Sequence, residues 1–498
     1  MKKFIYSILA AASLMSAVSC EDWLTTNPSS SVSDSQVFVS AKGAQAAMNG
    51  CYNLLSFGYG GSRPDTQGWA AQILANDAMG DDLVVTASGW YGYDYNHWGH
   101  QRGDIFKSYA LWNYYYNIIN NLNSIIYYAP KIDGVTAEDI AGVMGEALAM
   151  RGWCYFNLIQ YFQHTYVLAH ERKMPGVPIY TEPTTDQTEG KGRGTIDETY
   201  TQILQDLTDA EAYLDGYTRS AKNHFDQSVV QGLLSRVYLV MNDWDKAASY
   251  ASKARAGYPL TSNEDWNNGF NNLDTGSWMW GMAVDAEHTL ENNGDYGPFA
   301  MWCNKITRDG GDFWSFNCFF LNDKFVERFE ENDIRGKQMW WNDEYGLHSS
   351  NKFYDKTDLT GDFVYMRSDE MLLNEAEAKA HLGDDEGAAA LLNELRTLRG
   401  ATPTSTIGSS LLDEIVMERR KELYGEGFAW FDIIRQQRAL KREGDHADFA
   451  GAKPIPARSW RFTFQIPTNE IINNPNINSD PWPNGDQNIF GDVSIVLE

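Results

Sequence analysis

The chain has 498 residues, of which 43% are hydrophobic and 13% aromatic, including 17 Trp. This composition predicts a well-packed globular protein and excludes a disordered one. The formal net charge of −27 disfavours nucleic acid and anionic membrane surfaces as partners, because no basic stripe is present to displace counterions. The length allows either one large fold or two lobes.

The first residues have the pattern of a lipoprotein signal peptide. Lys2 and Lys3 precede a nearly uncharged apolar run, residues 4–18, which is shorter than the roughly 20 apolar residues of a transmembrane helix. Small residues then lead into Cys20, so we expect residues 1–19 to be removed and the Cys20 thiol to be acylated. Acyl chains contribute roughly 0.8 kcal/mol per buried CH2 and would hold the protein on a membrane. A plainly secreted protein with a chance cysteine here is the alternative.

Two acidic residues, Glu21 and Asp22, follow Cys20 directly. This pair resembles the export tag of bacterial surface lipoproteins, which are carried to the outer face of the outer membrane. The expected location is therefore the cell surface, with the protein lipid-anchored in the outer membrane.

The remaining cysteines are Cys51, Cys154, Cys303 and Cys318, and none of them forms a CxxC pair. The spacing therefore suggests neither a zinc site nor a thioredoxin-like motif. Cys51 and Cys154 lie in helical patterns and are expected in the core. Cys303 and Cys318 share one segment and could pair in an oxidising compartment, but the sequence leaves this open.

Apolar residues recur every three or four positions through much of the chain, which predicts a mostly α-helical protein. Thr136 and Thr195 are expected N-caps, each with an acidic residue three positions later. A loop is expected from residue 175 to 194. The expected helices cover residues 41–56, 104–128, 136–162, 195–214, 228–241, 244–256, 369–382, 386–399, 411–424 and 428–438.

Two of the expected helix pairs resemble each other, near residues 239–255 and 380–396. Asp243 matches Asp384, and Arg255 matches Arg396, with paired alanines between them. Each copy reads as a helix, a tight turn and a second helix, which is a tetratricopeptide-like hairpin. Such a hairpin must stack on neighbours to bury its apolar face, and the scaffold is more often an interaction surface than a catalytic one.

Four segments, in this order, carry a family signature. They are Gly145-Glu-Ala-Leu-Ala-Met-Arg151 with Trp153-Cys-Tyr-Phe156 and Gly176-Val-Pro-Ile179; Arg367-Ser-Asp-Glu-Met-Leu-Leu-Asn-Glu-Ala-Glu-Ala378 with Leu395-Arg396; Glu418-Arg-Arg-Lys-Glu-Leu423 with Glu426-Gly-Phe-Ala-Trp-Phe-Asp432 and Arg435; and Phe464-Gln-Ile-Pro467 with Glu470 and Asn474-Pro-Asn476. From Cys20 to about Ile477 the chain resembles the SusD/RagB family of nutrient-uptake lipoproteins.

The resemblance implies a mostly α fold, a tetratricopeptide-like helical-repeat scaffold with a large loop-rich, aromatic insertion at about residues 260–366. It implies a single domain over residues 20–498, with an N-terminal part at about 20–230 and a C-terminal part at about 231–498. The implied function is that of a non-catalytic surface lipoprotein that captures a nutrient, usually a glycan. The implied partner is a SusC-like TonB-dependent transporter, on which the protein would act as a lid.

Charged residues of the signature lie on helical patterns beside apolar residues. We expect them to form buried or half-buried ion pairs that hold helices together, and not to perform chemistry. They are Glu146, Arg151, Glu375, Arg419, Glu422, Asp432 and Arg435.

Rings outside the helices are the candidate glycan-binding residues. A flat Trp or Tyr ring can cover the apolar face of a sugar while amide, carboxylate or guanidinium groups bond its hydroxyls. Two stretches carry this mixture, the loop at residues 90–98 and the segment at 296–314. The candidates are Trp90, Tyr91, Tyr93, Asn96, Trp98, Tyr296, Trp302, Asn304, Arg308 and Trp314, with Trp340 and Trp341 next; Trp153, Trp244, Trp278 and Trp280 are expected in the core.

Signals for an enzyme are thin, because no HExxH, GxSxG, phosphate-binding or dinucleotide motif is present. The carboxylate pairs Asp81-Asp82 and Glu330-Glu331 are typical of solvated faces. His97 and His100 lack an assured third metal ligand, and no EF-hand spacing supports calcium. We therefore expect no catalytic residue, metal or cofactor. Oligopeptide cargo with the same transporter, or a surface glycoside hydrolase, are the alternatives.

Overall fold

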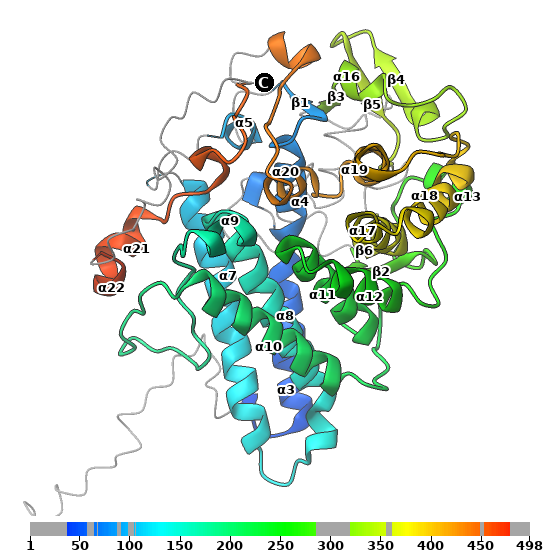
Figure 1. Cartoon of the computed structure of the whole chain (residues 1–498). Coiled ribbons are helices and arrows are strands. Elements are labelled where there is room, and N and C mark those ends of the chain that lie inside the picture. The colour runs from blue at the N-terminus through cyan, green and yellow to red at the C-terminus, as the bar shows by residue number, and fades with distance from the viewer. Residues whose placement is uncertain are drawn as a thin grey trace, which may run out of the picture.

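The computed structural model describes residues 37–56, 64–66, 68–86, 91–97, 104, 106–284, 319–354, 361–448 and 453–478. Helices dominate these residues, as the periodicity predicts (Figure 1). The longer ones are α3 (Ala41–Ser56), α4 (Gly68–Ala78), α7 (Phe106–Tyr128), α8 (Ala137–Phe162), α10 (Ile196–Tyr213), α11 (Gln227–Met241), α12 (Trp244–Ala254), α17 (Ser368–His381), α18 (Asp385–Arg399) and α19 (Gly408–Leu423).

Shorter helices and helical turns lie between and after these long helices. They are α5 (Tyr91–Tyr95), α9 (Tyr166–Glu171), α13 (Asn263–Asn267), α16 (Asp323–Val326), α20 (Ala429–Arg435), α21 (Thr468–Asn473) and α22 (Pro475–Asn478), with 3-10 turns η3 (Pro64–Thr66), η4 (Ala129–Lys131), η6 (Gly336–Gln338), η7 (Gly444–Asp448) and η8 (Trp460–Phe462).

The predicted helix starts are confirmed by their caps. The Thr136 hydroxyl accepts from the amide of Asp139 at 3.3 Å, and that of Thr195 from the amide of Glu198 at 3.1 Å. Both acidic side chains bond back to the cap amide, which completes two capping boxes. Helix α4 is not predicted by the sequence. All eleven of its residues are buried, so no polar face gives it a helical period.

Neighbouring helices pack in succession, α7 on α8, α8 on α10, α10 on α11, α11 on α12, α12 on α17 and α17 on both α18 and α19. Figure 1 shows α3, α7, α8 and α10 as a long bundle, from which α11, α12, α17 and α18 continue to one side. The fold is therefore the stacked helical-repeat scaffold that the sequence predicts.

The two similar helix pairs, α11–α12 and α17–α18, have turns of the same kind. Each turns through a left-handed residue, Asn242 at φ 58° and Gly383 at φ 80°, followed by an aspartate that caps the next helix. Arg255 then donates to Glu375 at 3.0 Å, and Arg396 donates to Glu418 at 3.0 Å. The matched arginines thus pin each copy to the helix that follows it.

The prediction that Trp244 lies in the core is wrong, because its ring lies between the two helix pairs. It is half-buried and stacks on His381 with ring centroids 3.8 Å apart and planes 8° from parallel. The predictions for Trp153, Trp278 and Trp280 are confirmed, because each ring is at most 1% exposed. Cys51 and Cys154 are buried free thiols, as expected.

Within the ranges that the structure describes, two small antiparallel sheets complete the fold. The strands are β1 (Leu83–Val85), β2 (Trp278–Met282), β3 (Phe319–Leu321), β4 (Met339–Asn342), β5 (Leu347–Ser350) and β6 (Phe363–Arg367). One sheet has the order β1-β3-β5-β4, with Leu83 opposite Leu321, and the other pairs β2 with β6, with Trp278 opposite Arg367. Strand β1 thereby ties the N-terminal part of the chain to the aromatic insertion.

The predicted ion pairs are present and buried. Arg151 binds Asp206 through Nε at 2.9 Å and Nη2 at 2.6 Å, between α8 and α10. Arg419 donates to Asp432 at 2.7 Å, which also accepts from Arg435 at 2.7 Å. The remaining predicted members do the same: Glu146 faces His224, Glu375 binds Arg255, and Arg435 binds Glu377.

The largest cluster of charges, which we call the Glu422 cluster, lies between β6, α17, α18 and α19. The Glu422 carboxylate accepts from three arginines, Arg335 at 3.0 Å, Arg367 at 2.9 Å and Arg399 at 2.7 Å, and all four side chains are 0% exposed. Burial opposes the negative charge, but the arginines hold the pKa of Glu422 well below its usual range. The cluster is completed by Asp333, Lys352, Asp369, Glu418 and Glu426.

Glu422→Ala should lower the free energy of unfolding by about 3–5 kcal/mol, because it leaves buried guanidinium groups without their shared carboxylate. Glu414→Ala is the matched control on the same helix. Glu414 accepts from Arg396 at 2.8 Å but is 29% exposed, so its loss should cost less than about 1 kcal/mol. Urea unfolding measures both, with Glu422→Gln added if the alanine variant does not fold. Equal losses in Glu422→Ala and Glu414→Ala would contradict the central role of the cluster.

The buried carboxyl group of Asp77 should make stability depend on pH. It is 2% exposed, accepts from the Ala429 amide at 3.0 Å, and burial raises its pKa to about 7. A raised carboxyl pKa means that the folded state holds the proton more tightly, so stability falls as pH rises from about 4 to about 7. Asp77→Asn should remove this loss. The free energy of unfolding of the variant, relative to that of the parent, should therefore be at least about 2 kcal/mol higher at pH 8 than at pH 5. Parallel pH dependence of the two proteins in urea unfolding would show that Asp77 is ionised throughout.

Candidate functional site

The sequence-predicted site lies partly outside the described residues. Tyr91, Tyr93 and Asn96 are described, in and just after α5. Seven other candidates lie outside the described ranges, as do Cys20, Cys303 and Cys318: Trp90, Trp98, Tyr296, Trp302, Asn304, Arg308 and Trp314.

The described part of this site is largely engaged in packing. Tyr91 is 1% exposed and meets the Phe319 ring of β3 edge-on at 5.1 Å, so its ring is not open to solvent for stacking on a sugar. Tyr93 and Asn96 are half-buried. Trp341, on the edge strand β4, is 52% exposed and is the ring of this region most open to solvent among the described residues.

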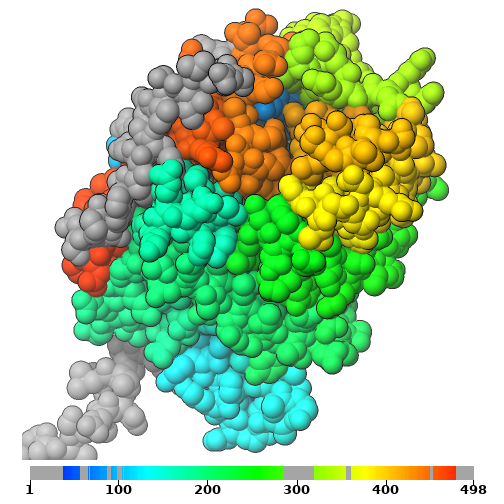
Figure 2. Space-filling model, in the orientation of Figure 1, coloured from blue at the N-terminus to red at the C-terminus, as the bar shows by residue number. Residues whose placement is uncertain are grey.

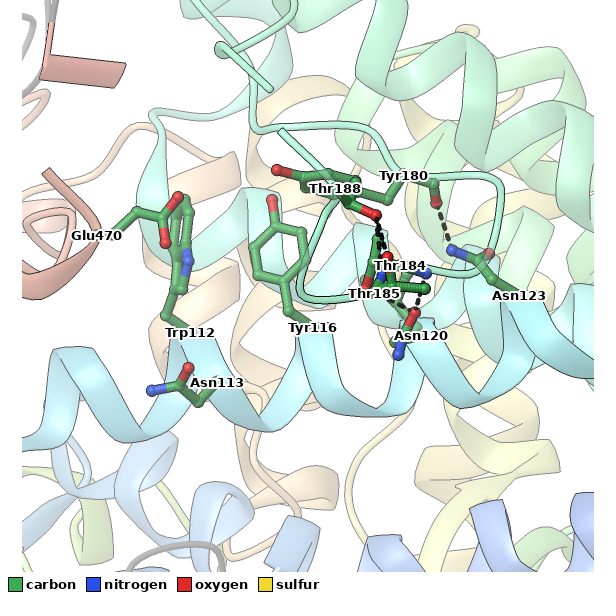
Figure 3. A pocket seen from close by; sticks show the side chains of 11 residues that line it. Trp112, Asn113, Tyr116, Asn120, Asn123, Tyr180, Thr184, Thr185, Thr188 and Glu470 are labelled. Carbon is green, nitrogen blue, oxygen red and sulfur yellow. Dashed lines mark hydrogen bonds between the residues drawn. The ribbon is translucent and has the colours of Figure 1, made fainter. Parts of the chain in front are cut away.

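A separate pocket on α7 combines rings with amide and hydroxyl groups, and Figure 3 shows it from close by. Its volume is about 240 Å³. Three elements form it: the face of α7, the loop that crosses this face, and α21. The lining side chains are Trp112, Asn113, Tyr116, Ile119, Asn120 and Asn123 of α7, Tyr180, Thr184, Thr185 and Thr188 of the loop, and Glu470 of α21.

Helical spacing places the α7 members on one face. Positions 112, 116, 119, 120 and 123 are three or four residues apart, so they line up along the helix. The loop is held over this face by its backbone. The Tyr180 carbonyl accepts from Asn123 Nδ2 at 3.0 Å and from the Tyr155 hydroxyl at 2.8 Å, and the Thr184 amide donates to Asn120 at 2.8 Å.

Three rings form the apolar side of the pocket. Trp112 and Tyr116 lie 4.9 Å apart at 49°, and Tyr116 meets Tyr180 edge-on at 5.9 Å. Trp112 packs against the core and is only 4% exposed, whereas the two tyrosines are half-buried. Burial raises the pKa of both Tyr116 and Tyr180, so their phenol groups stay protonated. The Tyr116 hydroxyl donates to the Pro178 carbonyl at 2.8 Å, which fixes its ring.

The polar side keeps bonding capacity that the protein does not use. Asn120 Oδ1 accepts from Thr184, while its Nδ2 makes no hydrogen bond within the ranges that the structure describes. Asn113 donates through Nδ2 to the Tyr109 carbonyl at 3.0 Å, which leaves its oxygen as an acceptor at the rim. One Glu470 oxygen accepts from Asn474 Nδ2 at 2.8 Å. A donor, an acceptor and a carboxylate therefore surround the rings.

Sequence reasoning missed this pocket, because it assigned the rings of α7 to the apolar face of an amphipathic helix. One signal was available. Asparagines alternate with the rings along α7, at positions 113, 117, 120, 121 and 123. Asn is a weak helix former, so its repeated use beside rings on a long helix indicates a polar task for that face.

Comparisons with known proteins agree on one family. The chain matches a family described as starch-binding associating with outer membrane over residues 25–239, and the SusD family over residues 347–482. It is 23% identical to a SusD-like protein of Formosa agariphila, over 89% of this chain and 94% of the relative.

Solved structures support the same assignment. A SusD-like carbohydrate binding protein from Bacteroides vulgatus is 29% identical with a TM-score of 0.77, covering 88% of this chain and 97% of its own. A SusD superfamily protein from Bacteroides thetaiotaomicron is 26% identical with a TM-score of 0.74, covering 88% of this chain and 99% of its own. With two models of the family matching in order, and these structures matching along nearly their whole length, the chain belongs to the SusD/RagB family.

Proposed function

We propose that the protein is a non-catalytic surface lipoprotein that captures a glycan or oligosaccharide and delivers it to a SusC-like TonB-dependent transporter. The family is associated with the outer membrane, and no helix in the described ranges is long and apolar enough to cross a membrane. The observation that carries the proposal is the pocket on α7, where rings and unused amide groups meet on a scaffold of a family described as starch-binding.

The chemistry of the pocket suits a sugar. Tyr116 and Tyr180 offer ring surface to the apolar face of a pyranose, and Asn113, Asn120 and Glu470 offer both donors and acceptors to its hydroxyls. Apart from the buried Tyr91, the aromatic residues predicted at positions 90–98 and 296–314 are proposed as a second contact surface for a longer chain.

The charges around the pocket favour binding without hydrolysis. Glycoside hydrolysis uses two carboxyl groups on either side of the scissile bond. Among the described residues that line the pocket, Glu470 is the one carboxylate, and one of its oxygens is bonded to Asn474. Other carboxylates of the family signature, such as Glu146, Glu422 and Asp432, are bound by arginine or histidine in the scaffold.

Filling the pocket should abolish its contribution to glycan binding. Asn113→Trp places a large ring at the rim and should weaken binding at least tenfold, since contacts at a binding hot spot are typically each worth about 2 kcal/mol. Asn121→Trp is the matched control, because Asn121 lies on the same exposed helix surface and makes the same bond to the preceding turn, Nδ2 to the Asn117 carbonyl at 2.8 Å. Affinity electrophoresis on a panel of soluble polysaccharides measures both variants.

Two outcomes would move or reject this site. Normal binding by Asn113→Trp, together with loss in Trp98→Ala and Trp302→Ala at unchanged melting temperature, would place the site on the predicted aromatic loops. Binding of oligopeptides but of no polysaccharide would replace glycan by peptide cargo.

Cys20→Ala should release the protein from the cell, because the acyl chains on that thiol are its proposed anchor. Protease treatment and antibody labelling of intact cells, with the culture medium assayed in parallel, measure the change. Retention of the variant at the cell surface would mean that another part of the protein provides the anchor.

A further inference from the structure

A second hollow lies beside the ends of strands β1 and β3 and has a cationic lining. Its volume is about 330 Å³. Figure 2 shows the place: the blue N-terminal part of the chain is visible at the bottom of a recess between yellow-green, gold and orange segments. Five basic side chains line it, from α16, the turn after it, α19 and the segment that follows α20: Lys324, Arg328, Arg420, Arg438 and Lys441.

Two of these cations are neutralised by the protein. Arg420 is paired with Asp82 through two hydrogen bonds, and Lys324 with Glu327 at 2.8 Å. Two carboxylates also line the hollow, those of Asp81 and Glu443. The Oδ1 of Asp81 accepts from the backbone amide groups of Lys441 and Arg442 at 3.0 and 3.2 Å.

The other three cations, Arg328, Arg438 and Lys441, form no ion pair with any residue in the described ranges. Arg438 is the most informative. Its Nε donates to Gln436 at 2.7 Å, but its two terminal nitrogens have no partner within the same ranges. Burial lowers the pKa of Arg438, and the neighbouring positive charge of Arg420 lowers it further; together they outweigh the opposing effect of the Asp81, Asp432 and Asp82 carboxylates. A guanidinium group that is partly removed from water without an ion pair is energetically unfavourable, so an anion bound directly to it in the hollow would stabilise it.

We propose that this hollow binds the oxyanion of an acidic sugar, a carboxylate or a sulfate ester, as part of the captured glycan. The inference rests on the proposed glycan-binding function and narrows its substrate class. A guanidinium group presents a planar fork that matches two oxygens of a carboxylate or sulfate, and flanking lysine and arginine add charge without demanding one geometry. The volume falls at the lower end of the range of small-molecule pockets, which fits one sugar unit.

The charge of the whole chain gives the hollow its importance. A net charge of −27 repels an acidic polysaccharide at long range. An acidic glycan can therefore bind this protein only where cations are locally in excess. The hollow provides such an excess, because five basic side chains line it and only two carboxylates, those of Asp81 and Glu443, do so.

Calorimetric titration of the full chain tests the proposal with charged and neutral forms of the same glycan. The probes are oligogalacturonate and its carboxyl-reduced counterpart, a sulfated galactan oligosaccharide that contains no uronic acid and its desulfated counterpart, and inorganic sulfate alone. The paired variant Arg438→Gln with Lys441→Gln should weaken binding of a charged probe at least tenfold and leave its neutral counterpart unchanged. Raising the salt concentration should weaken binding of the charged probe only. If only the galacturonate pair shows this difference, the hollow binds a carboxylate; if only the sulfated pair does, it binds a sulfate ester.

Lys337→Gln is the matched control, because it removes an exposed positive charge outside the hollow. Arg438 has no ion pair to lose, so the paired variant should melt no lower than the parent; if it fails to fold, Lys441→Glu at an exposed position makes the same test. Equal weakening by Lys337→Gln, unchanged binding by the paired variant, or binding of inorganic sulfate alone would overturn the proposal. If neutral glycans bind as tightly as their charged counterparts, this inference is wrong but the proposed function is not. If no glycan binds, both are wrong.

Discussion

The Glu422 cluster is the interaction on which the rest of the structure depends. Its charges come from β6, α17, α18, α19 and the turn before η6, elements that are separated along the chain. Each charge is costly when buried alone, and the cost is offset only when all partners are in place. The cluster therefore favours one relative arrangement of these elements over any partial one. In a helical-repeat fold most contacts are between neighbouring repeats. The cluster adds contacts between elements that are far apart in sequence, and these hold the fold in one arrangement.

Helix α19 shows how this constraint also positions the cationic hollow. Within one short stretch, Glu418 and Glu422 face the buried cluster, Arg419 reaches Asp432 on α20, and Arg420 turns outward to Asp82 beside β1. Fixing the two glutamates fixes the rotation of the helix, and this places Arg420 at the wall of the cationic hollow. The arrangement of the hollow is thus a consequence of core electrostatics, and rigid elements position its charges more accurately than a free loop would.

Much of the scaffold could be predicted from the sequence, and the reasons differ from element to element. The amphipathic helices, their caps at Thr136 and Thr195, and the repeated hairpins follow local rules and are confirmed. Helix α4 could not be predicted, because a helix that is buried on all sides has no polar period. The short strands have too few residues to show alternation, and strand pairs such as β1 with β3 join residues more than 200 positions apart.

The pocket on α7 was missed for a related reason: a ring on an apolar helix face has the same sequence pattern whether it meets another helix or a loop that leaves space for a ligand.

The two candidate surfaces differ in the physical interaction that they offer, and this difference has a consequence for selectivity. The α7 pocket offers ring faces and amide groups, whose contacts with a neutral sugar would depend little on salt, beside one carboxylate, that of Glu470. The cationic hollow offers unpaired guanidinium and ammonium groups, which distinguish a charged sugar from its neutral analogue and are screened by salt. A glycan long enough to reach both surfaces would bind more tightly than through either one alone. Once the first contact is made, the second is intramolecular and does not again cost the entropy of bringing two molecules together. A short neutral oligosaccharide would gain nothing from the hollow, and a small free anion would gain nothing from the rings. If both proposed surfaces bind glycan, the molecule should select for glycans that combine length with acidic groups.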